Sequence, residues 1–503
     1  MTGDSTGYGD LYPAASSQRG FASTDDEPPS LRSRGATPAQ ARKSDQTTRA
    51  PWRGALLALE NLPLELVFLA IALTWGVLQV FIVPPFQVPD EGDHWFRAWA
   101  LTDGQLTADK QGMVTLPASF TRPADLYTRL VAAGVLPVSL VGQAGFAGYE
   151  DLFNGTGPSG TVKVPSRVAS YGPLGYLPQA LGVALGRLLG APPLTCFYLA
   201  RLGNLLAAVA LLFLAIRIAP FGKPLFLLLA LLPMTMFELA SVSCDALTIA
   251  GAMLFTALAL RASARPTLRR TDIALLVSVA AVLLNIKPGY WALVLLVLLI
   301  RPAQLGGRLR FVLFVAGSIL VVALIFLFVV LLTSTDARIQ GGGGPQAQLL
   351  FIARQPLDFL GIVWSNLQAN LVKWPLESIG VLGWFTIALP PLSYLLVLVG
   401  GFGALLQWRE DVRLRARERA LLAVVGAAVF GTMVVALYAF LEPTGSGQVQ
   451  VQGRYLAPVL LLLLLSVYGI RFAPRPLGRF ATVGVVLVVA AQNLQTLISV
   501  YHP

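Results

Sequence analysis

The sequence predicts an all-α membrane protein: a polytopic bundle of transmembrane helices with a large first loop on the outer side of the membrane. Of its 503 residues, 55% are hydrophobic and only 13% are charged, whereas about a quarter are charged in an ordinary soluble domain. Apolar runs of roughly 17–25 residues recur along the chain, and such runs can cross a hydrocarbon core of about 30 Å as helices. The net charge of +11 lies in short loops between these runs, which does not favour a nucleic-acid-binding face.

Residues 1–55 differ in composition from the rest, being rich in Ser, Thr, Gly, Pro, Asp and Arg. Such a segment cannot bury enough apolar surface to order itself, so we expect a disordered cytoplasmic tail followed by one membrane domain, 56–503. The first apolar run lies too far from the start and is too long for a cleaved signal peptide, so it should remain as the first span.

The apolar runs predict about eleven spans. The two around Pro288 are short, because proline breaks a helix there, and they can be counted differently. The expected spans are 62–85, 196–218, 222–240, 244–262, 271–287, 289–301, 311–333, 383–407, 419–441, 454–471 and 479–500.

Arginine and lysine set the expected orientation. If the spans alternate, five basic loops and the basic tail fall on one side, which is cytoplasmic by the positive-inside rule. The C-terminus and the long stretches 86–195 and 334–382 then lie outside. Within the first stretch, residues 171–190 are apolar but interrupted by Pro and Gly and contain Arg187, which favours an interfacial helix.

The densest polar segment, residues 88–98, directly follows the first span. Pro89 suits the first helical position, and Asp90 and Glu91 suit a first helical turn, where backbone N–H groups favour negative charge. Helical spacing would place Asp90, His94 and Arg97 on one face. The alternative is a capped interfacial helix whose Trp residues lie in the aromatic belt.

Further polar residues fall at the expected outer ends of later spans: Arg201, Glu238, Asp245, Lys287 and Arg454. Ionisable groups in a helical bundle usually pair internally or serve a site. Taken singly, each is more simply explained by pairing or by snorkelling to the interface. Their shared side of the membrane favours a functional role.

The segment 447–458 places alternate glutamines, including Gln452, before Arg454 and Tyr455. Amides and a guanidinium suit sugar hydroxyls and a phosphate, since Arg offers a planar fork of donors. An outer hairpin followed by a snorkelling Arg is equally compatible with the pattern. The two cysteines, Cys196 and Cys244, support neither a disulfide framework nor a thiolate metal site.

Several of these stretches resemble a bacterial family called domain of unknown function 2142. The resemblance rests on Pro89-Asp90-Glu91 with His94 just after the first span, and on the segments 233–247, 285–291 and 452–458. That family in turn resembles the C-type glycosyltransferases, multi-spanning enzymes that take a sugar from a polyprenyl-phosphate carrier and use an acidic residue of the first outer loop. Residues 171–174 and 200–202 partly match motifs of the mannosyl- and aminoarabinose-transferase branches, but Gly203 replaces the expected proline.

The resemblance implies an inverting glycosyltransferase in the bacterial cytoplasmic membrane, with its active site facing outward. Its donor would be a polyprenyl-phosphate sugar, and its acceptor a cell-envelope glycan, lipid or protein. Asp90 is the expected general base and Glu91 the second candidate. The resemblance implies no cofactor and leaves a divalent metal open. The expected substrate-binding residues are His94, Arg97, Arg201, Glu238, Asp245, Lys287, Gln452, Arg454 and Tyr455.

Two other functions fit the same residues. A flippase or transporter for a lipid-linked saccharide would use the same outward cations and amides without breaking a bond. We find no internal repeat of the kind that transporters often have. A noncatalytic partner in envelope polysaccharide assembly is the third possibility.

Overall fold

The computed structural model describes residues 62–132, 150, 153–154, 159–168, 171–333, 344–406, 414–442, 445–469 and 477–502. The tail expected at 1–55 lies outside these ranges. In the described part, six helices are long and apolar enough to cross a membrane, so the chain is a helical multi-pass membrane protein. They are Leu64–Ile82 (α2), Pro193–Ile218 (α7), Asp245–Ala264 (α10), Arg308–Phe328 in α12 (Arg308–Thr333), Ala416–Phe440 in α17 (Ala416–Leu441) and Thr482–Tyr501 in α19 (Leu477–Tyr501).

The other five expected spans are shorter or broken, so the count of eleven stays a prediction. Where one span was expected at 222–240, the chain forms α8 (Lys223–Ala230) and α9 (Pro233–Leu239). Leu232 is extended there because a residue before proline disfavours the helical region. Three more of the expected spans correspond to single helices that are shorter than a full span: α11 (Arg270–Ile286), α16 (Pro391–Leu406) and α18 (Ala457–Val467).

Two span boundaries differ from expectation because of prolines. The segment expected at 289–301 is a 3₁₀ helix, η3 (Pro288–Leu299), followed by the short η4 (Pro302–Leu305). The span expected from residue 383 begins only at Pro391, after Pro390, and residues 381–388 form a hairpin instead.

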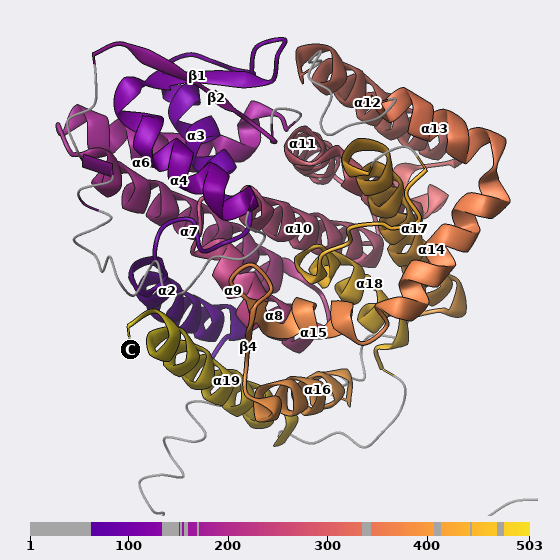
Figure 1. The fold of residues 1–503 in the computed structure, drawn as a ribbon. Coiled ribbons are helices and arrows are strands. Elements are labelled where there is room, and N and C mark those ends of the chain that lie inside the picture. The colour runs from indigo at the N-terminus through magenta and orange to yellow at the C-terminus, as the bar shows by residue number, and fades with distance from the viewer. Residues whose placement is uncertain are drawn as a thin grey trace, which may run out of the picture. The chain divides into compact units, whose positions relative to one another are not determined.

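Helix α10 lies at the centre of the bundle. Of its most apolar membrane-length window, 89% is buried, against 6% in α12. It packs against α7, α11, η3 and α18 (Figure 1). Helix α12 instead exposes Leu309, Leu313 and Leu320, as expected for a helix at the periphery that faces lipid.

The described parts of the two long stretches between spans form helices and strands. The first contains α3 (Glu91–Thr102), η1 (Ala118–Phe120), α4 (Thr121–Ala132), η2 (Pro173–Tyr176), α6 (Leu177–Leu188) and the antiparallel strands β1 (Met113–Pro117) and β2 (Thr161–Pro165). The second contains α13 (Gly344–Arg354), α14 (Pro356–Ala369), α15 (Lys373–Gly380) and the hairpin of β3 (Val381–Leu382) and β4 (Ile387–Ala388). The expectation of an all-α chain therefore missed two small antiparallel sheets of two strands each.

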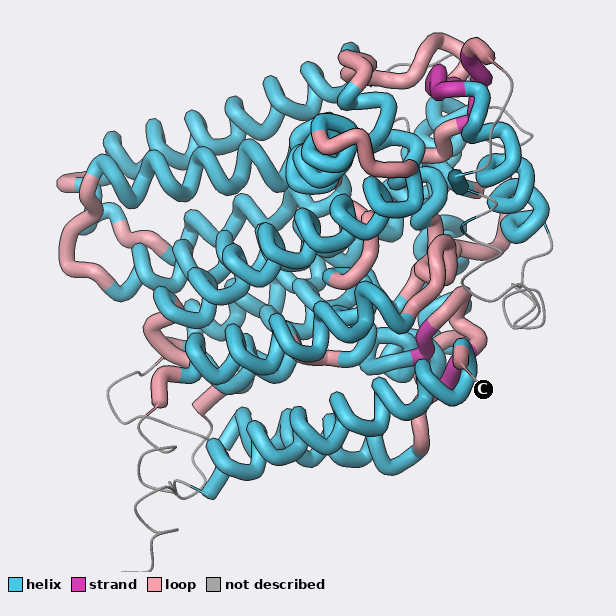
Figure 2. The backbone as a smooth tube through the Cα atoms, turned by 90° about the vertical axis from the view of Figure 1, so that its left-hand side faces the viewer, coloured by secondary structure: helices cyan, strands magenta, loops and turns pink. Residues whose placement is uncertain are grey.

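The C-terminus and both small sheets lie at the same end of the long helices (Figure 2). His502 Nε2 lies 2.9 Å from the carbonyl oxygen of Ile82, where α2 ends. Residues of the basic loops contact one another instead: Arg301 pairs with Glu418 at 2.9 Å, and Arg419 donates to the Ser466 carbonyl. These contacts agree with the expected threading, while the side of the membrane that each end faces stays a prediction.

Candidate functional site

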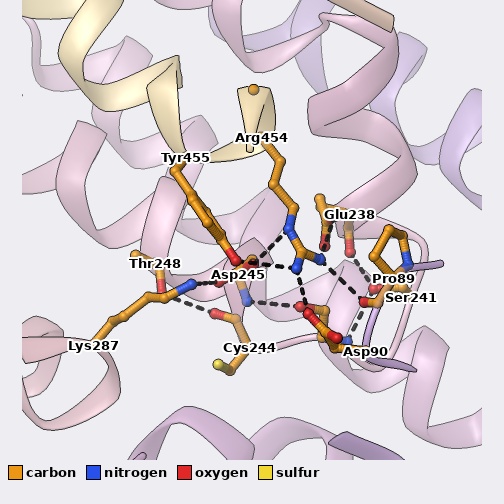
Figure 3. A network of polar contacts seen from close by, with 12 residues as sticks. Pro89, Asp90, Glu238, Ser241, Cys244, Asp245, Thr248, Lys287, Arg454 and Tyr455 are labelled. Carbon is orange, nitrogen blue, oxygen red and sulfur yellow. Dashed lines mark hydrogen bonds and ion pairs between the residues drawn. The ribbon is translucent and has the colours of Figure 1, made fainter. Parts of the chain in front are cut away.

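Four breaks in the helical bundle meet at one cluster of polar side chains, which we call the central cluster. Each member lies at or near the end of a helix. Helix ends leave backbone groups free and project side chains inward, so polar groups gather there. The central cluster comprises Asp90 before α3, Glu238 on α9, Asp245 at the start of α10, Lys287 after α11, and Arg454 and Tyr455 in η5 (Gly453–Leu456) (Figure 3).

Arg454 is the hub of the cluster. Its Nη2 donates to Asp90 Oδ2 at 2.5 Å, its Nη1 to Glu238 Oε1 at 3.2 Å, and its Nε lies 3.4 Å from Asp245 Oδ2. Nη1 also donates to the Pro89 carbonyl at 3.0 Å. The guanidinium side chain is only 1% exposed, so three carboxylates compensate a buried cation.

Lys287 extends the cluster on the other side of Asp245. Its Nζ donates to Asp245 Oδ1 at 2.5 Å and lies 4.1 Å from the centre of the Tyr455 ring and 5.4 Å from that of Tyr171. The aromatic faces stabilise the ammonium group by cation–π attraction. Asp245 is thus shared between the two cations, which fixes Lys287 beside Arg454.

Asp90 is the accessible carboxylate of the cluster. Its side chain is 32% exposed, against 0% for Glu238 and 3% for Asp245. Its backbone is left-handed, with φ 62°. Residues other than glycine rarely adopt this conformation, and it recurs at functional sites. Helix α3 begins at Glu91, so the expectation that Pro89 opens the helix was wrong by two residues.

Glu91 and Arg201 form a separate ion pair, and the side chain of each is 0% exposed. Arg201 donates to both carboxylate oxygens, at 2.8 and 2.7 Å, and its remaining N–H groups reach the carbonyl oxygens of Val80, Val83 and Pro84. Every polar atom of this pair is engaged in joining α2, α3 and α7. The sequence grouped these two residues with the site, but the structure places them in a junction behind it.

His94 and Arg97 lie next to the cluster without pairing with Asp90. His94 Nδ1 is 2.8 Å from the Tyr176 hydroxyl, and burial lowers the pKa of its ring to about 4. Arg97 donates to the carbonyl oxygens of Gln105 and Leu106 and so closes the loop after α3. The predicted common face of Asp90, His94 and Arg97 is therefore divided among three sets of partners.

Asp93, in the same motif, was not singled out by sequence reasoning. Its carboxylate accepts from the Tyr127 hydroxyl at 2.6 Å and from the Arg167 amide at 3.1 Å. Burial raises its pKa to about 6. Its position among three acidic residues was the available signal, but its partners lie 34 and 74 positions away in the chain.

Gln452 lies two residues before Arg454 and lines a cavity of about 770 Å³. The cavity is bounded by α14, α15, the tip of the β3–β4 hairpin and residues 447–452. The backbone amide of Gly453 donates to Glu377 Oε2 at 3.0 Å. Gln452, which lines the cavity, and Arg454, the hub of the cluster, thus belong to one short segment.

The central cluster has the parts of a proton-accepting and anion-binding site. An accessible carboxylate can accept a proton from a bound hydroxyl, and two adjacent cations can stabilise a phosphate. The buried Glu238 Oε2 has no hydrogen-bond partner among the described residues, so an acceptor remains available for a ligand hydroxyl.

Comparison with known proteins gave one family. The family model described as "Predicted membrane protein (DUF2142)" matches residues 73–463, which include every member of the central cluster. No curated protein and no solved structure matches the chain.

Proposed function

The chain belongs to the DUF2142 family of predicted membrane proteins, and we propose that it is a glycosyltransferase that moves a sugar from polyprenyl phosphate to an acceptor hydroxyl. The observation that carries this proposal is the position of Asp90: a solvent-accessible carboxylate bound to the buried Arg454, with Lys287 reaching the same cluster through Asp245. The resemblance of the family to the C-type glycosyltransferases supports it only by analogy.

In the proposed reaction, Asp90 acts as the general base. The acceptor oxygen attacks the anomeric carbon of the donor, and its proton passes to the Asp90 carboxylate. The bond from the anomeric carbon to the phosphate oxygen breaks, and the polyprenyl phosphate leaves with the bonding electrons. Attack opposite the leaving group inverts the anomeric configuration.

Arg454 and Lys287 would stabilise the leaving phosphate. The charge that develops on the phosphate oxygens is best compensated by cations already fixed in a site with little water. Both are held in advance, Arg454 by three carboxylates and Lys287 by Asp245 and two aromatic rings. The site would face the outer side of the cytoplasmic membrane, where the carrier presents its sugar.

We expect Asp90→Asn to lower sugar transfer by about 10²–10⁴-fold, the usual contribution of a general base. Asparagine tolerates the left-handed backbone at this position, so the variant should fold. The measurement is transfer of label from polyprenyl-phosphate mannose and polyprenyl-phosphate arabinose in membranes that contain the protein. Unchanged transfer by Asp90→Asn would remove this residue from the mechanism.

The matched control is Asp109→Asn. Asp109 is also an acidic residue of the first long stretch, paired with Lys163 at 2.8 Å, but it lies outside the central cluster and should leave transfer unchanged. The same preparation, reconstituted in liposomes, tests the flippase alternative. Movement of the labelled lipid between leaflets without any product would replace the enzyme by a transporter.

A further inference from the structure

The cavity beside the central cluster has the chemistry of a carbohydrate site. Its volume of about 770 Å³ falls within the range of about 300–1,000 Å³ that is usual for ligand sites. Its wall combines amide side chains with large aromatic rings, which suit the hydroxyls and the apolar C–H faces of sugars. The amides are Asn366, Asn370, Gln448, Gln450 and Gln452, and the rings are Trp374, Trp384 and Phe385.

Several of the amides are unoccupied. Gln448 and Gln450 are exposed, and within the ranges that the structure covers their side-chain amides have no hydrogen-bond partner. The side-chain oxygen of Gln452 is buried and equally without a partner. A buried polar group left unpaired is costly, so a ligand that supplies a hydroxyl donor is favoured there.

The wall itself is fixed by other contacts. Asn366 accepts from the Val449 amide at 3.1 Å and donates to the Gly447 carbonyl at 2.9 Å, which ties the glutamine segment to α14. Trp384 Nε1 donates to the Phe86 carbonyl at 3.0 Å, which ties the hairpin tip to the chain just before Asp90. A preformed wall reduces the entropy lost when a ligand binds.

The charges of the cavity favour a neutral ligand. Its two charged lining residues, Lys373 and Glu377, carry opposite signs and lie 3.8 Å apart. A phosphate or an acidic sugar would meet no net positive charge there. The cations Arg454 and Lys287 do not line this cavity.

We propose that this cavity binds the neutral saccharide part of the acceptor. That the saccharide is an acceptor rests on the proposed function, but binding itself does not require transfer. Gln452 of the cavity wall lies two residues before Arg454, which binds Asp90 at 2.5 Å, so the proposed acceptor site adjoins the proposed general base. The acceptor then carries a neutral saccharide, as an envelope glycan does.

The test is binding of an array of neutral and acidic oligosaccharides of two to six units to the purified full chain in detergent. Neutral members should bind, and Gln448→Ala/Gln450→Ala should weaken their binding about tenfold or more, since several hydrogen bonds are lost. The control is Gln368→Ala, an exposed glutamine on the same α14 as Asn366 that does not line the cavity.

Three outcomes overturn the inference: no member of the array binds, only acidic members bind, or the double variant binds as the unaltered chain does. Asp90→Asn should bind the neutral saccharides normally. If it does, and yet transfers sugar at the full rate, the cavity assignment stands and the proposed mechanism fails. If Asp90→Asn loses transfer but the unaltered chain binds no saccharide, the mechanism stands and the cavity assignment fails.

Discussion

His94 shows how burial changes one side chain of the motif at residues 88–98. Its ring is enclosed beside Tyr176 and Tyr171, and its pKa of about 4 lies below the ordinary value of 6.5. The folded chain therefore holds His94 neutral. The stability that the neutral, buried ring contributes is fully present above about pH 6.5 and is lost as the pH falls through about 4.

We expect the unaltered chain to lose roughly 3 kcal/mol of stability relative to His94→Gln between about pH 6.5 and pH 4. Asp93 opposes this trend, because its raised pKa, about 6, gives a contribution that is lost as the pH rises. The difference between the two chains cancels Asp93 and isolates His94. Unfolding in detergent at several pH values measures it.

The control for that series is His502→Gln, at an exposed histidine near the C-terminus. The difference between His94→Gln and the unaltered chain should appear equally when both chains also carry His502→Gln. A gap between His94→Gln and the unaltered chain that stays constant over the same range would contradict the assignment of a buried neutral ring.

Asp90 and Glu91 are neighbours with opposite surroundings. The left-handed backbone of Asp90 turns its side chain toward Arg454, while Glu91 faces Arg201 and is fully enclosed. Breaking a buried ion pair leaves an uncompensated charge and costs about 3–5 kcal/mol. Glu91 is thus suited to hold the start of α3 in place, which positions Asp90.

At the scale of elements, α6 and α7 pack through glycines. A Cβ added at Gly182 would lie 2.3 Å from the Leu199 carbonyl oxygen, and one at Gly203 would lie 2.4 Å from that of Pro178. Small residues allow such close approach of helix backbones in membranes. This explains why glycine stands at position 203, where proline was expected from the motif of the mannosyl- and aminoarabinose-transferase branches.

Gly182→Ala should destabilise the chain by about 1–3 kcal/mol, because the added methyl group meets backbone that cannot move aside. Thermal unfolding in detergent is the measurement. Gly317→Ala on α12 is the matched control, since nothing lies within 4 Å of a Cβ there and alanine favours a helix. Equal melting temperatures for the two variants would show that α6 and α7 are not closely packed.

At the scale of the whole molecule, cysteine labelling tests which side of the membrane each end of the helical bundle faces. We expect Lys163→Cys, on β2, to react with a membrane-impermeant maleimide in intact cells. Arg308→Cys, at the exposed start of α12, should react only after permeabilisation, because basic loops remain in the cytoplasm. Both changes are made in a chain whose buried, free cysteines, Cys196 and Cys244, are replaced by alanine.

The reverse labelling pattern would place the central cluster on the cytoplasmic side. An outward site supplied by an extracytoplasmic donor would then be wrong, even if Asp90 proved essential. Equal labelling of both positions in intact cells would contradict the alternating threading itself.

The sequence by itself determined the membrane class, the long helices and the residues of the central cluster. Apolar length is a local property, so α2, α7 and α10 were predictable from their own residues. The polar residues were recognisable because ionisable groups are rare at the ends of apolar runs. The expected threading placed these residues on one side of the membrane, but their contacts with Arg454 were seen only in the structure.

Only the tertiary structure decided which partner each polar residue has. Asp90 pairs with a residue 364 positions away and Glu91 with one 110 positions away, and the spacing of neither predicts this. The pairing of β1 with β2 and the cavity at Gln452 also depend on chain segments far apart in sequence. Ion pairs and cavities form where distant segments meet, whereas the length of an apolar run and the position of a helix break are determined by neighbouring residues.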